Sequence, residues 1–172
     1  YGPDIAHDGP DPARVNYQQV HLPLRLRQAV DTLNPAIPAA AREDAIKQAL
    51  DLGVPAVLAA NRQFHRMLVA GVPVQYQKDG ETRGDFVQLI DWAEPGRNDW
   101  LAVNQFSIKG PHHTRRPDII LFVNGLPLVQ IELKTLEVRP QKAMQQIVDY
   151  KNDPGNGYNN SLLCFVQLFI VS

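Results

Sequence analysis

The hydrophobic positions of the chain change their spacing near Gly71. Before it, apolar residues recur every three or four positions, and each such stretch ends in a glycine or in Asn-Pro. This pattern predicts a short extended piece and a helix within 17–35, and helices over 38–53 and 54–71. The first 16 residues are rich in proline and poor in apolar side chains, and we expect them to form an extended loop.

After Gly71 the apolar residues alternate with polar ones or run together in short segments. Such segments predict β-strands, and an Asp-Gly or Asn-Gly pair between two of them predicts a hairpin. The strands are expected within 72–92 (two strands), 99–110, 117–123, 127–134 and 161–171, with one more helix over 140–153. The last strands are almost continuously apolar, so the final one should be fully buried and both sheet faces covered. The predicted fold class is α/β, with an N-terminal helical segment and a mixed central β-sheet flanked by helices.

Composition places the chain among globular proteins with one ordinary domain. Its 172 residues are 44% hydrophobic and 20% charged, and a formal net charge of −1 does not by itself indicate a nucleic-acid binder. No apolar run reaches the ~18 residues of a membrane helix, and no signal peptide is visible. Cys164 is the only cysteine, which excludes an internal disulfide, favours a reducing cytosol and predicts a small core residue.

The two ends of the chain suggest a piece of a longer protein. The sequence opens on a segment rich in Gly, Pro and Asp and stops inside a predicted strand. We expect residues 1–172 to form a single domain of that longer protein. The alternative is that the ends of the chain are disordered.

Charged residues stand in the apolar hairpin predicted over 117–134. Asp118 lies at the start of its first strand, and Glu132 and Lys134 lie at the end of its second. Because strand side chains alternate between faces, Gln130, Glu132 and Lys134 share one face. Charges in a buried strand are costly unless something pairs with them, so this grouping requires an explanation.

Two readings of these charges compete. Two carboxylates can bind a hard cation such as Mg²⁺, with water and phosphate oxygens completing its shell. A lysine can position or deprotonate an attacking water, or neutralise developing charge. The structural alternative is a salt bridge between Glu132 and Lys134, which a bare Glu-x-Lys tripeptide favours. The complete pattern of Pro-Asp, apolar run, turn and second apolar run favours the metal-dependent site.

A shared cation makes a demand on the hairpin register. An ideal two-residue loop at the Asn-Gly pair would place Asp118 opposite Ile131, so that Asp118 and Glu132 would face opposite sides of the sheet. One cation could not easily contact both. The shared site therefore predicts an odd-length loop or a bulge, with Gly125 in a left-handed conformation. Pro127 lacks an N–H and is a suitable place for the ladder to be interrupted.

Basic residues gather just before this hairpin. Lys109, Arg115 and Arg116 accompany His112 and His113. They could form a patch that faces phosphates, or a solvated loop, and composition leaves both readings open. For the two histidines we favour the loop.

Two other polar features are assigned structural roles. Asp91 could add a carboxylate from a neighbouring strand, but an acid at a surface or strand end is the favoured reading. Asn61 and His65 are four residues apart on a predicted helix, a spacing that could hold a metal, but their apolar neighbours favour packing.

The ordered motifs resemble a known nuclease family. Pro117-Asp118 followed by Glu132-Leu133-Lys134 is similar to the PD-(D/E)xK nuclease signature. More specifically, RRPDIILFVNGLPLVQIELK followed by AMQQIVDY resembles the N-terminal nuclease domain of the restriction (R) subunit of type I restriction-modification enzymes. The stretches LRQAVDTLNPAIP, NRQFHRMLVAGVPV and LIDWAEPGRNDWLAVNQFSI fit the same family. The similarity extends over nearly the whole chain from about Tyr17 onward.

The resemblance implies a restriction-endonuclease-like core that cleaves DNA, as a type I site-specific deoxyribonuclease. Asp118 and Glu132 would bind Mg²⁺, the backbone carbonyl of Leu133 would add a metal ligand, and Lys134 would be the catalytic lysine. The family also has an acidic site residue on a helix upstream of this region, and we expect this chain to begin after it.

The resemblance also implies contacts with DNA beyond these residues. Gln146 and Tyr150 match a Gln-x-x-x-Tyr motif that accompanies this nuclease type, and their i, i+4 spacing puts both on one helix face. We expect three basic residues to contact the DNA phosphates as accessory binding residues: Lys109, Arg115 and Arg116.

The implied partners are double-stranded DNA and the modification (M) and specificity (S) subunits of a type I complex. ATP would be used only by domains outside this chain, since no phosphate loop of the G-x-x-x-x-G-K-[ST] type occurs in it. The expected location is the cytoplasm of a prokaryotic cell, without membrane contact.

Two rival functions remain from the sequence. One is a stand-alone or repair-type nuclease with the same core, which helicase motifs downstream in the full protein would exclude. The other is a non-catalytic DNA-binding or assembly module with the same fold, which metal binding and nicking lost on Lys134→Ala would exclude.

Overall fold

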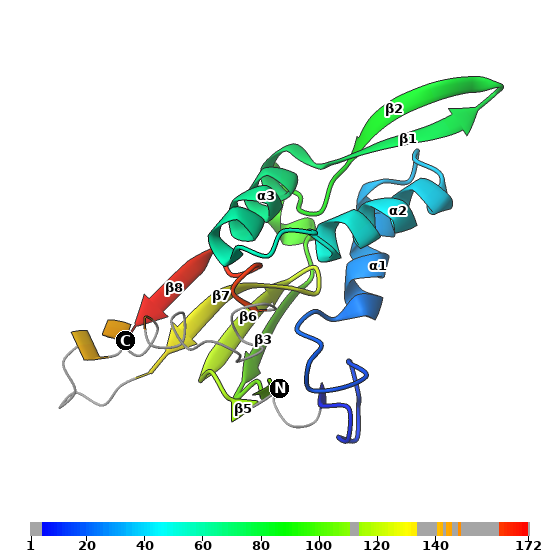
Figure 1. Cartoon of the computed structure of the whole chain (residues 1–172). Helices are drawn as coiled ribbons and strands as arrows, with labels where there is room; N and C mark the ends of the chain where they lie inside the picture. The colour runs from blue at the N-terminus through cyan, green and yellow to red at the C-terminus, as the bar shows by residue number, and fades with distance from the viewer. Residues whose placement is uncertain are drawn as a thin grey trace.

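The computed structural model describes residues 5–110, 114–133, 141–142, 144–145, 148 and 162–171. Helices come first along the chain and strands follow, as the change of period predicts. The three long helices are α1 (Pro23–Leu33), α2 (Ala39–Leu50) and α3 (Val57–Ala70). Figure 1 shows them gathered around one end of the main sheet, with the short strand β5 (Thr114–Arg115) near the other end.

The helices form because their apolar residues lie on one face. In α3, Ala60, Phe64 and Leu68 are buried at i, i+4 spacing, so one stripe of the helix faces the core. The helix ends at Gly71, whose φ of 86° is a conformation that only glycine adopts without strain. Helix α1 begins with Pro23 at its first turn, where a missing N–H costs nothing.

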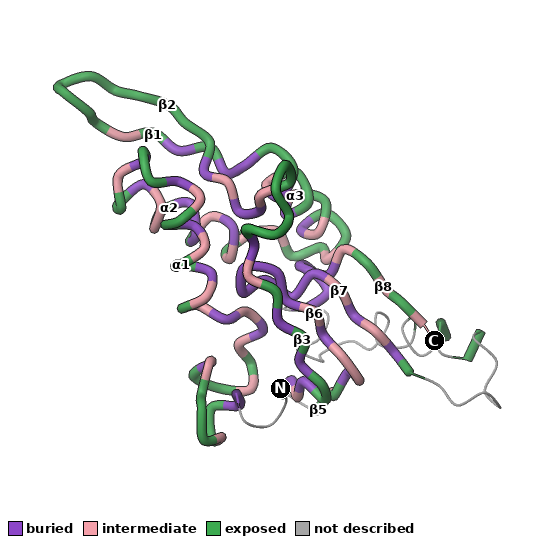
Figure 2. The backbone as a smooth tube through the Cα atoms, turned by 180° about the vertical axis from the view of Figure 1, so that it is seen from behind, coloured by how far each residue is buried: buried purple, intermediate pink, exposed green. Residues whose placement is uncertain are grey.

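A two-stranded hairpin follows α3. It consists of β1 (Val72–Lys78) and β2 (Glu81–Val87), paired antiparallel over seven residue pairs without a register shift. The hairpin forms its own sheet and projects from the rest of the chain (Figures 1 and 2). All of β2 except Val87 is exposed. The two strands predicted around Asp79-Gly80 are therefore confirmed.

Within the described residues, the main sheet has four strands in the order β3-β6-β7-β8. These are β3 (Trp100–Asn104), β6 (Ile119–Val123), β7 (Leu126–Glu132) and β8 (Leu168–Val171). The first three pair antiparallel and β8 pairs parallel to β7, so the sheet is mixed, as expected. Between β2 and β3 lies a 3₁₀ turn, η2 (Pro95–Arg97), and a short ribbon of β4 (Ile108–Lys109) with β5 connects β3 to β6.

One face of the main sheet belongs to the core and the other is partly open. Leu101, Val103, Ile120 and Phe122 are buried on the first face. On the opposite face, Val123 and Leu126 next to the turn are buried, but the other in-register side chains from β3 to β8 are intermediate or exposed, with Trp100 53% and Leu168 51% exposed. Figure 2 shows the buried inner strands and the exposed β8. The prediction that both faces are covered is therefore wrong for these described residues.

The last predicted strand is also corrected. Only Leu168–Val171 is a strand, with alternating exposed and intermediate residues, whereas the buried residues 162–166 form a turn. Phe165 packs edge-on against Phe64 at 4.8 Å between ring centroids. The apolar run is continuous because its first half packs under α3 as a turn, not because a strand is buried on both faces. The helix predicted over 140–153 lies mostly outside the described residues.

Candidate active site

The hairpin of β6 and β7 contains the predicted irregularity. Val123 pairs with Leu126 across the turn and Phe122 with Pro127, but the register then shifts, and Leu128 has no partner on β6. Its carbonyl instead accepts the N–H of Gln167, at 2.8 Å, beside the start of β8. Pro127, the residue just before Leu128, has no backbone N–H and so cannot donate a hydrogen bond to the ladder. The predicted bulge is therefore confirmed, and so is the left-handed conformation of Gly125, whose φ is 76°.

The bulge decides which residues share a face. Beyond it, Ile120 pairs with Gln130 and Ile119 with Ile131. The same register brings Asp118 opposite Glu132, and since opposed residues in an antiparallel pair point the same way, both carboxylates belong to one face. A regular ladder would have separated them.

Asp118 is tied to strands on both of its sides. Its backbone carbonyl accepts the N–H of Gln105, at 2.7 Å, which continues the β3–β6 ladder. Its Oδ2 accepts the N–H of Leu133, at 2.8 Å. The side chain therefore reaches across to the end of β7, next to Glu132.

Glu132 is buried, with 3% of its surface exposed, and Gln130 is buried completely. The amide Nε2 of Gln130 donates a hydrogen bond of 2.8 Å to Oε1 of Glu132. A buried carboxylate requires such donors because the loss of hydration is costly. The polar face of β7 thus lies inward, while Val129 and Ile131 on the other face are only half-buried.

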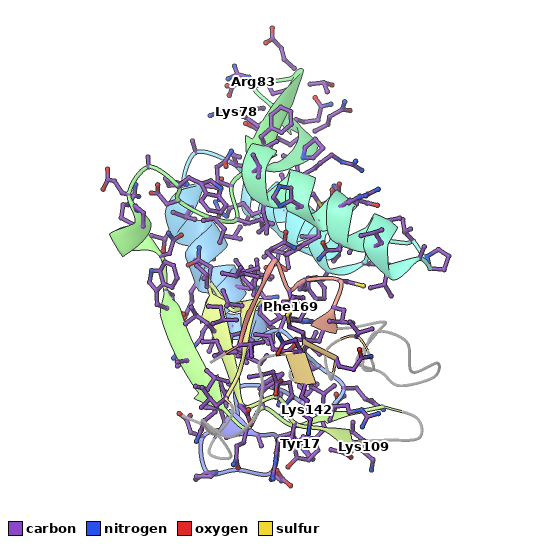
Figure 3. The ribbon with its side chains drawn as sticks, turned by 90° about the vertical axis from the view of Figure 1, so that its left-hand side faces the viewer. Tyr17, Lys78, Arg83, Lys109, Lys142 and Phe169 are labelled. Carbon is purple, nitrogen blue, oxygen red and sulfur yellow. The ribbon has the colours of Figure 1, made fainter. Side chains whose placement is uncertain are left out.

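Basic residues lie next to this strand end. Lys109 is exposed on β4, Arg115 is half-buried on β5, and Arg116 is exposed just before Asp118. Figure 3 shows Lys109 and Lys142 at the end of the molecule opposite Lys78 and Arg83. The predicted basic group is therefore brought to the same end as the two carboxylates.

Arg14 holds the corner between β3 and β4. Its side chain is 5% exposed and donates to the carbonyl of Ser107, at 2.7 Å, while the guanidinium lies 4.0 Å from the centroid of the Phe106 ring. Burial lowers the pKa of Arg14 to about 10, so it remains a cation at neutral pH. This brace fixes the segment that precedes β4 and whose Gln105 supports Asp118.

The turn end of the same hairpin is built differently. Asn124 is fully buried, and its side chain bonds to the Leu89 carbonyl, to Asn98 Oδ1 and to the Asp99 N–H at 2.7–2.8 Å. Gly125 accepts the N–H of Leu22 at the start of α1, at 2.8 Å. This end has its polar groups paired within the fold and is structural.

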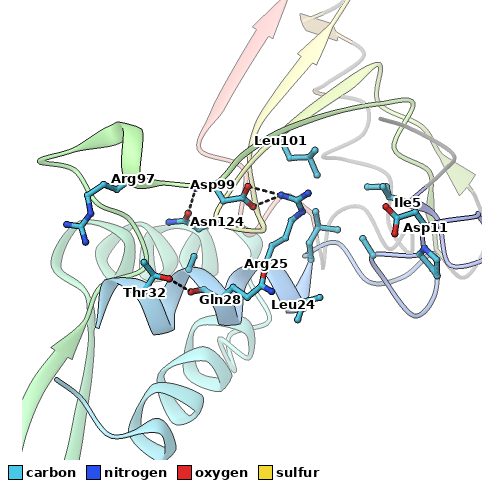
Figure 4. Close-up of a pocket in the computed structure, with 14 residues that line it drawn as sticks. Ile5, Asp11, Leu24, Arg25, Gln28, Thr32, Arg97, Asp99, Leu101 and Asn124 are labelled. Atoms are coloured by element: carbon cyan, nitrogen blue, oxygen red, sulfur yellow. Dashed lines mark hydrogen bonds and ion pairs between the residues drawn. The ribbon is translucent and has the colours of Figure 1, made fainter. Parts of the chain in front are cut away.

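A cavity of the described part lies apart from the two carboxylates. A cavity of about 530 Å³ lies against α1 near the turn end, where Nη1 of Arg25 donates to both oxygens of Asp99 at 2.7 Å (Figure 4). The two charges neutralise each other, and they lie at the far end of the hairpin from Asp118.

The two structural assignments made from sequence are confirmed. Asp91 accepts hydrogen bonds from the backbone N–H groups of Ala93 and Glu94 and forms an ion pair of 3.0 Å with Arg97. Asp118 is not among these partners. Asp91 adds no carboxylate to the candidate site.

Asn61 donates to the carbonyls of Leu163, Cys164 and Val166 at 2.9–3.2 Å, and His65 bonds Gln167 at 2.9 Å. Both side chains hold the turn before β8. Cys164 is buried, as expected of a core residue.

Several predicted site residues lie outside the described residues. These are Lys134, Gln146, Tyr150, His112 and His113. Within the described residues, no group of three or more His, Cys, Asp and Glu side chains could hold a metal. Two carboxylates fit Mg²⁺, which commonly uses one or two carboxylates and completes its shell with water and phosphate oxygens.

Sequence reasoning assigned no role to Gln130 or Arg14. The signal for Gln130 was present, since a polar residue in phase with Glu132 interrupts an apolar strand. Arg14 stands in a proline-rich segment and bonds to residues more than 90 positions away, so no local signal could reveal it.

A mixed sheet preceded by helices, with an acidic pair at one end of its central hairpin, is compatible with a restriction-endonuclease-like core. The family model for the type I restriction enzyme R protein N terminus matches residues 2–172. The chain belongs to this family.

Individual relatives agree with the family. The chain is 40% identical to the type I restriction enzyme HindI endonuclease subunit of Haemophilus influenzae, over 78% of the chain and 13% of the relative. It is 27% identical to a putative type I restriction enzyme MjaIXP endonuclease subunit of Methanocaldococcus jannaschii, over 92% of the chain and 15% of the relative. It is 41% identical to the type I restriction enzyme EcoprrI endonuclease subunit of Escherichia coli, over half of the chain and 27% of the relative. The chain thus spans a small part of these relatives.

Among the described residues, no helix has the length and apolar character needed to cross a membrane.

Proposed function

We propose that this chain is the nuclease domain of a type I restriction enzyme R subunit and that it cleaves double-stranded DNA by Mg²⁺-dependent hydrolysis. The observation that supports this most directly is the bulge, because it puts Asp118 and Glu132 on one face at one strand end. The family and the names of the relatives support the reaction class. Residues 1–172 would form one domain of a longer subunit that works with M and S subunits in a prokaryotic cytoplasm, with ATP-driven translocation performed by other domains.

In this proposal Asp118 and Glu132 hold the cation, with the Leu133 carbonyl as a third protein oxygen. The Leu133 N–H already holds one Asp118 oxygen, which limits rotation of that carboxylate. Bound Mg²⁺ supplies positive charge that polarises the scissile phosphate and makes water more acidic. Without a cation, the two carboxylates would repel the phosphodiester.

The remaining residues act on the nucleophile and on the DNA. Lys134, two residues after Glu132, would position or deprotonate the attacking water or neutralise the developing charge. Lys109, Arg115 and Arg116 are charged groups at the same end and would contact phosphates. Gln146 and Tyr150 would contact the bound strand from the helix predicted after the hairpin.

The test is DNA cleavage by the full-length subunit in its complete complex, with Mg²⁺ and ATP. Asp118→Asn keeps the size of the side chain but removes its charge, and we expect cleavage to fall about 100-fold or more, since several kcal/mol of charge stabilisation are lost. ATP hydrolysis by the same complex should stay near the wild-type rate, because the proposed ATP site lies in other domains.

Asp85→Asn is the matched control, because Asp85 is an exposed carboxylate on β2 that bonds only the Tyr76 hydroxyl among the contacts described. It should leave cleavage unchanged. Normal cleavage by Asp118→Asn would overturn the assignment, and normal ATP hydrolysis without any cleavage in the wild type would favour the non-catalytic module.

A further inference from the structure

Gln130 is an unusual residue for the centre of a sheet. It lies between Ile120 on β6 and Phe169 on β8, in register with both, and none of its surface is exposed. An apolar residue would fit these neighbours without the cost of burying an amide. The residue must therefore make polar contacts that compensate for the loss of hydration.

One such contact is with Glu132, the next side chain on the same face. Gln130 Nε2 lies 2.8 Å from Glu132 Oε1, a normal hydrogen-bond length. A glutamate has three rotatable side-chain bonds, so its carboxylate can turn unless a donor holds one oxygen. The amide of Gln130 holds that oxygen from the protein interior, behind the strand end at which Asp118 is held by Leu133.

The two carboxylates are thus held by different means. Asp118 is fixed by a backbone N–H, which every residue type at position 133 except proline would supply. One oxygen of Glu132 is held by a side chain, the amide of Gln130. The contact that holds Glu132 can therefore be removed by a substitution at position 130, without a change in the backbone.

We infer that Gln130 is a positioning residue for the metal site, which orients the Glu132 carboxylate toward a divalent cation shared with Asp118. The inference rests on the proposed function, because it needs Glu132 to be a metal ligand. Partners that orient metal ligands typically contribute about 10-fold to 100-fold in metal affinity.

Mn²⁺ binding to the full-length subunit tests this inference without relying on cleavage. Binding is measured by electron paramagnetic resonance with short duplex DNA and without ATP, and the site is defined as the Mn²⁺ bound by the wild type but not by Glu132→Gln. Gln130→Met keeps the length of the side chain and removes its donor. We expect the Mn²⁺ dissociation constant to rise about 10-fold. Gln130→Leu serves as the second variant if the first does not fold.

Ile120→Val is the matched control, since Ile120 pairs with Gln130, is fully buried and loses one methyl group but no hydrogen-bond donor. It should bind Mn²⁺ as the wild type does, even where its thermal stability is lower. An unchanged dissociation constant in the Gln130 variants would overturn the inference, and so would an equal rise in Ile120→Val. A wild type without the defined Mn²⁺ site would instead overturn the proposed metal site itself.

Discussion

The two β-hairpins of this protein contain the same kind of turn in opposite surroundings. The β1–β2 turn at Asp79-Gly80 and the β6–β7 turn at Asn124-Gly125 both have two successive residues with positive φ, 55° and 83° in the first and 52° and 76° in the second. This is the conformation of a two-residue hairpin turn that an Asp-Gly or Asn-Gly pair favours. The local sequence therefore determines both turns equally well.

The surroundings of the turns differ completely. A Cβ atom on Gly80 would meet nothing within 4 Å, whereas one on Gly125 would lie 2.5 Å from the Leu22 carbonyl oxygen and 2.8 Å from the Leu26 nitrogen. The exposed hairpin keeps a regular register, but the buried one shifts at Leu128. The difference teaches that a turn motif predicts the turn and not the ladder that follows it.

The largest expected difference between the hairpins is in their glycines. Gly125→Ala should lower the free energy of unfolding by about 4 kcal/mol or prevent folding, because positive φ strain is added to a clash with the backbone of α1. Gly80→Ala should cost only about 1–2 kcal/mol, since it suffers the same strain without the clash. Urea unfolding of both variants measures the difference. Equal losses would mean that α1 does not press on the turn.

The residues before the glycines should differ almost as much. Asn124→Ala leaves the buried Leu89 carbonyl and Asp99 N–H without their side-chain partner, and we expect a loss of about 3 kcal/mol. Asp79→Ala at the matching position introduces alanine at a similar φ but removes only a distant ion pair of 3.9 Å with Arg83. Its loss should be about 2 kcal/mol smaller. A difference near zero in the same unfolding assay would contradict a structural role for the Asn124 contacts.

The smallest expected effect is a dependence on pH at the support of the buried turn. His21 precedes Leu22, which bonds Gly125, and burial lowers the pKa of His21. The unfolded chain, with an ordinary histidine pKa of about 6.5, then binds protons more readily than the folded protein. This contribution to stability is present above about pH 6.5 and is lost as the pH falls through the lower folded pKa.

The free energy of unfolding should therefore fall more steeply between pH 7.5 and pH 5 in the wild type than in His21→Gln. The β1–β2 hairpin contains no histidine, so changes within it should not alter this slope. Identical slopes in the wild type and His21→Gln would show that His21 is not the titrating group.

Much of the fold follows from local pattern. The three N-terminal helices, the exposed hairpin and the strands of the β6–β7 hairpin are predicted by hydrophobic period, glycine positions and turn pairs. The single strand predicted over 99–110 is instead divided into β3 and β4, which belong to different sheets. The segment 161–171 was predicted as one buried strand, because an apolar run is equally compatible with a strand and with a turn packed under a helix. Only the contacts of Asn61 and Phe64 with that segment show which half is the turn.

The candidate site shows the same division. Asp118 and Glu132 were chosen from the sequence, and the need for a bulge followed from requiring them to share a cation. The sequence could not tell that Leu128 is the extra residue, because its carbonyl is satisfied from Gln167, nearly 40 positions away. Arg14 was missed for the same reason, since its partner Ser107 is distant in the chain.

The sequence by itself determined most of the elements, the two hairpin turns and the residue types able to bind a cation, because these depend on neighbours along the chain. The tertiary structure alone decided the register, the inward orientation of Gln130 and Glu132, and the burial of the Asn124-Gly125 turn against α1. Each of these depends on groups that satisfy one another's hydrogen bonds across distant segments. At the bulge, the folded chain supplies the N–H of Gln167 as the partner of the Leu128 carbonyl.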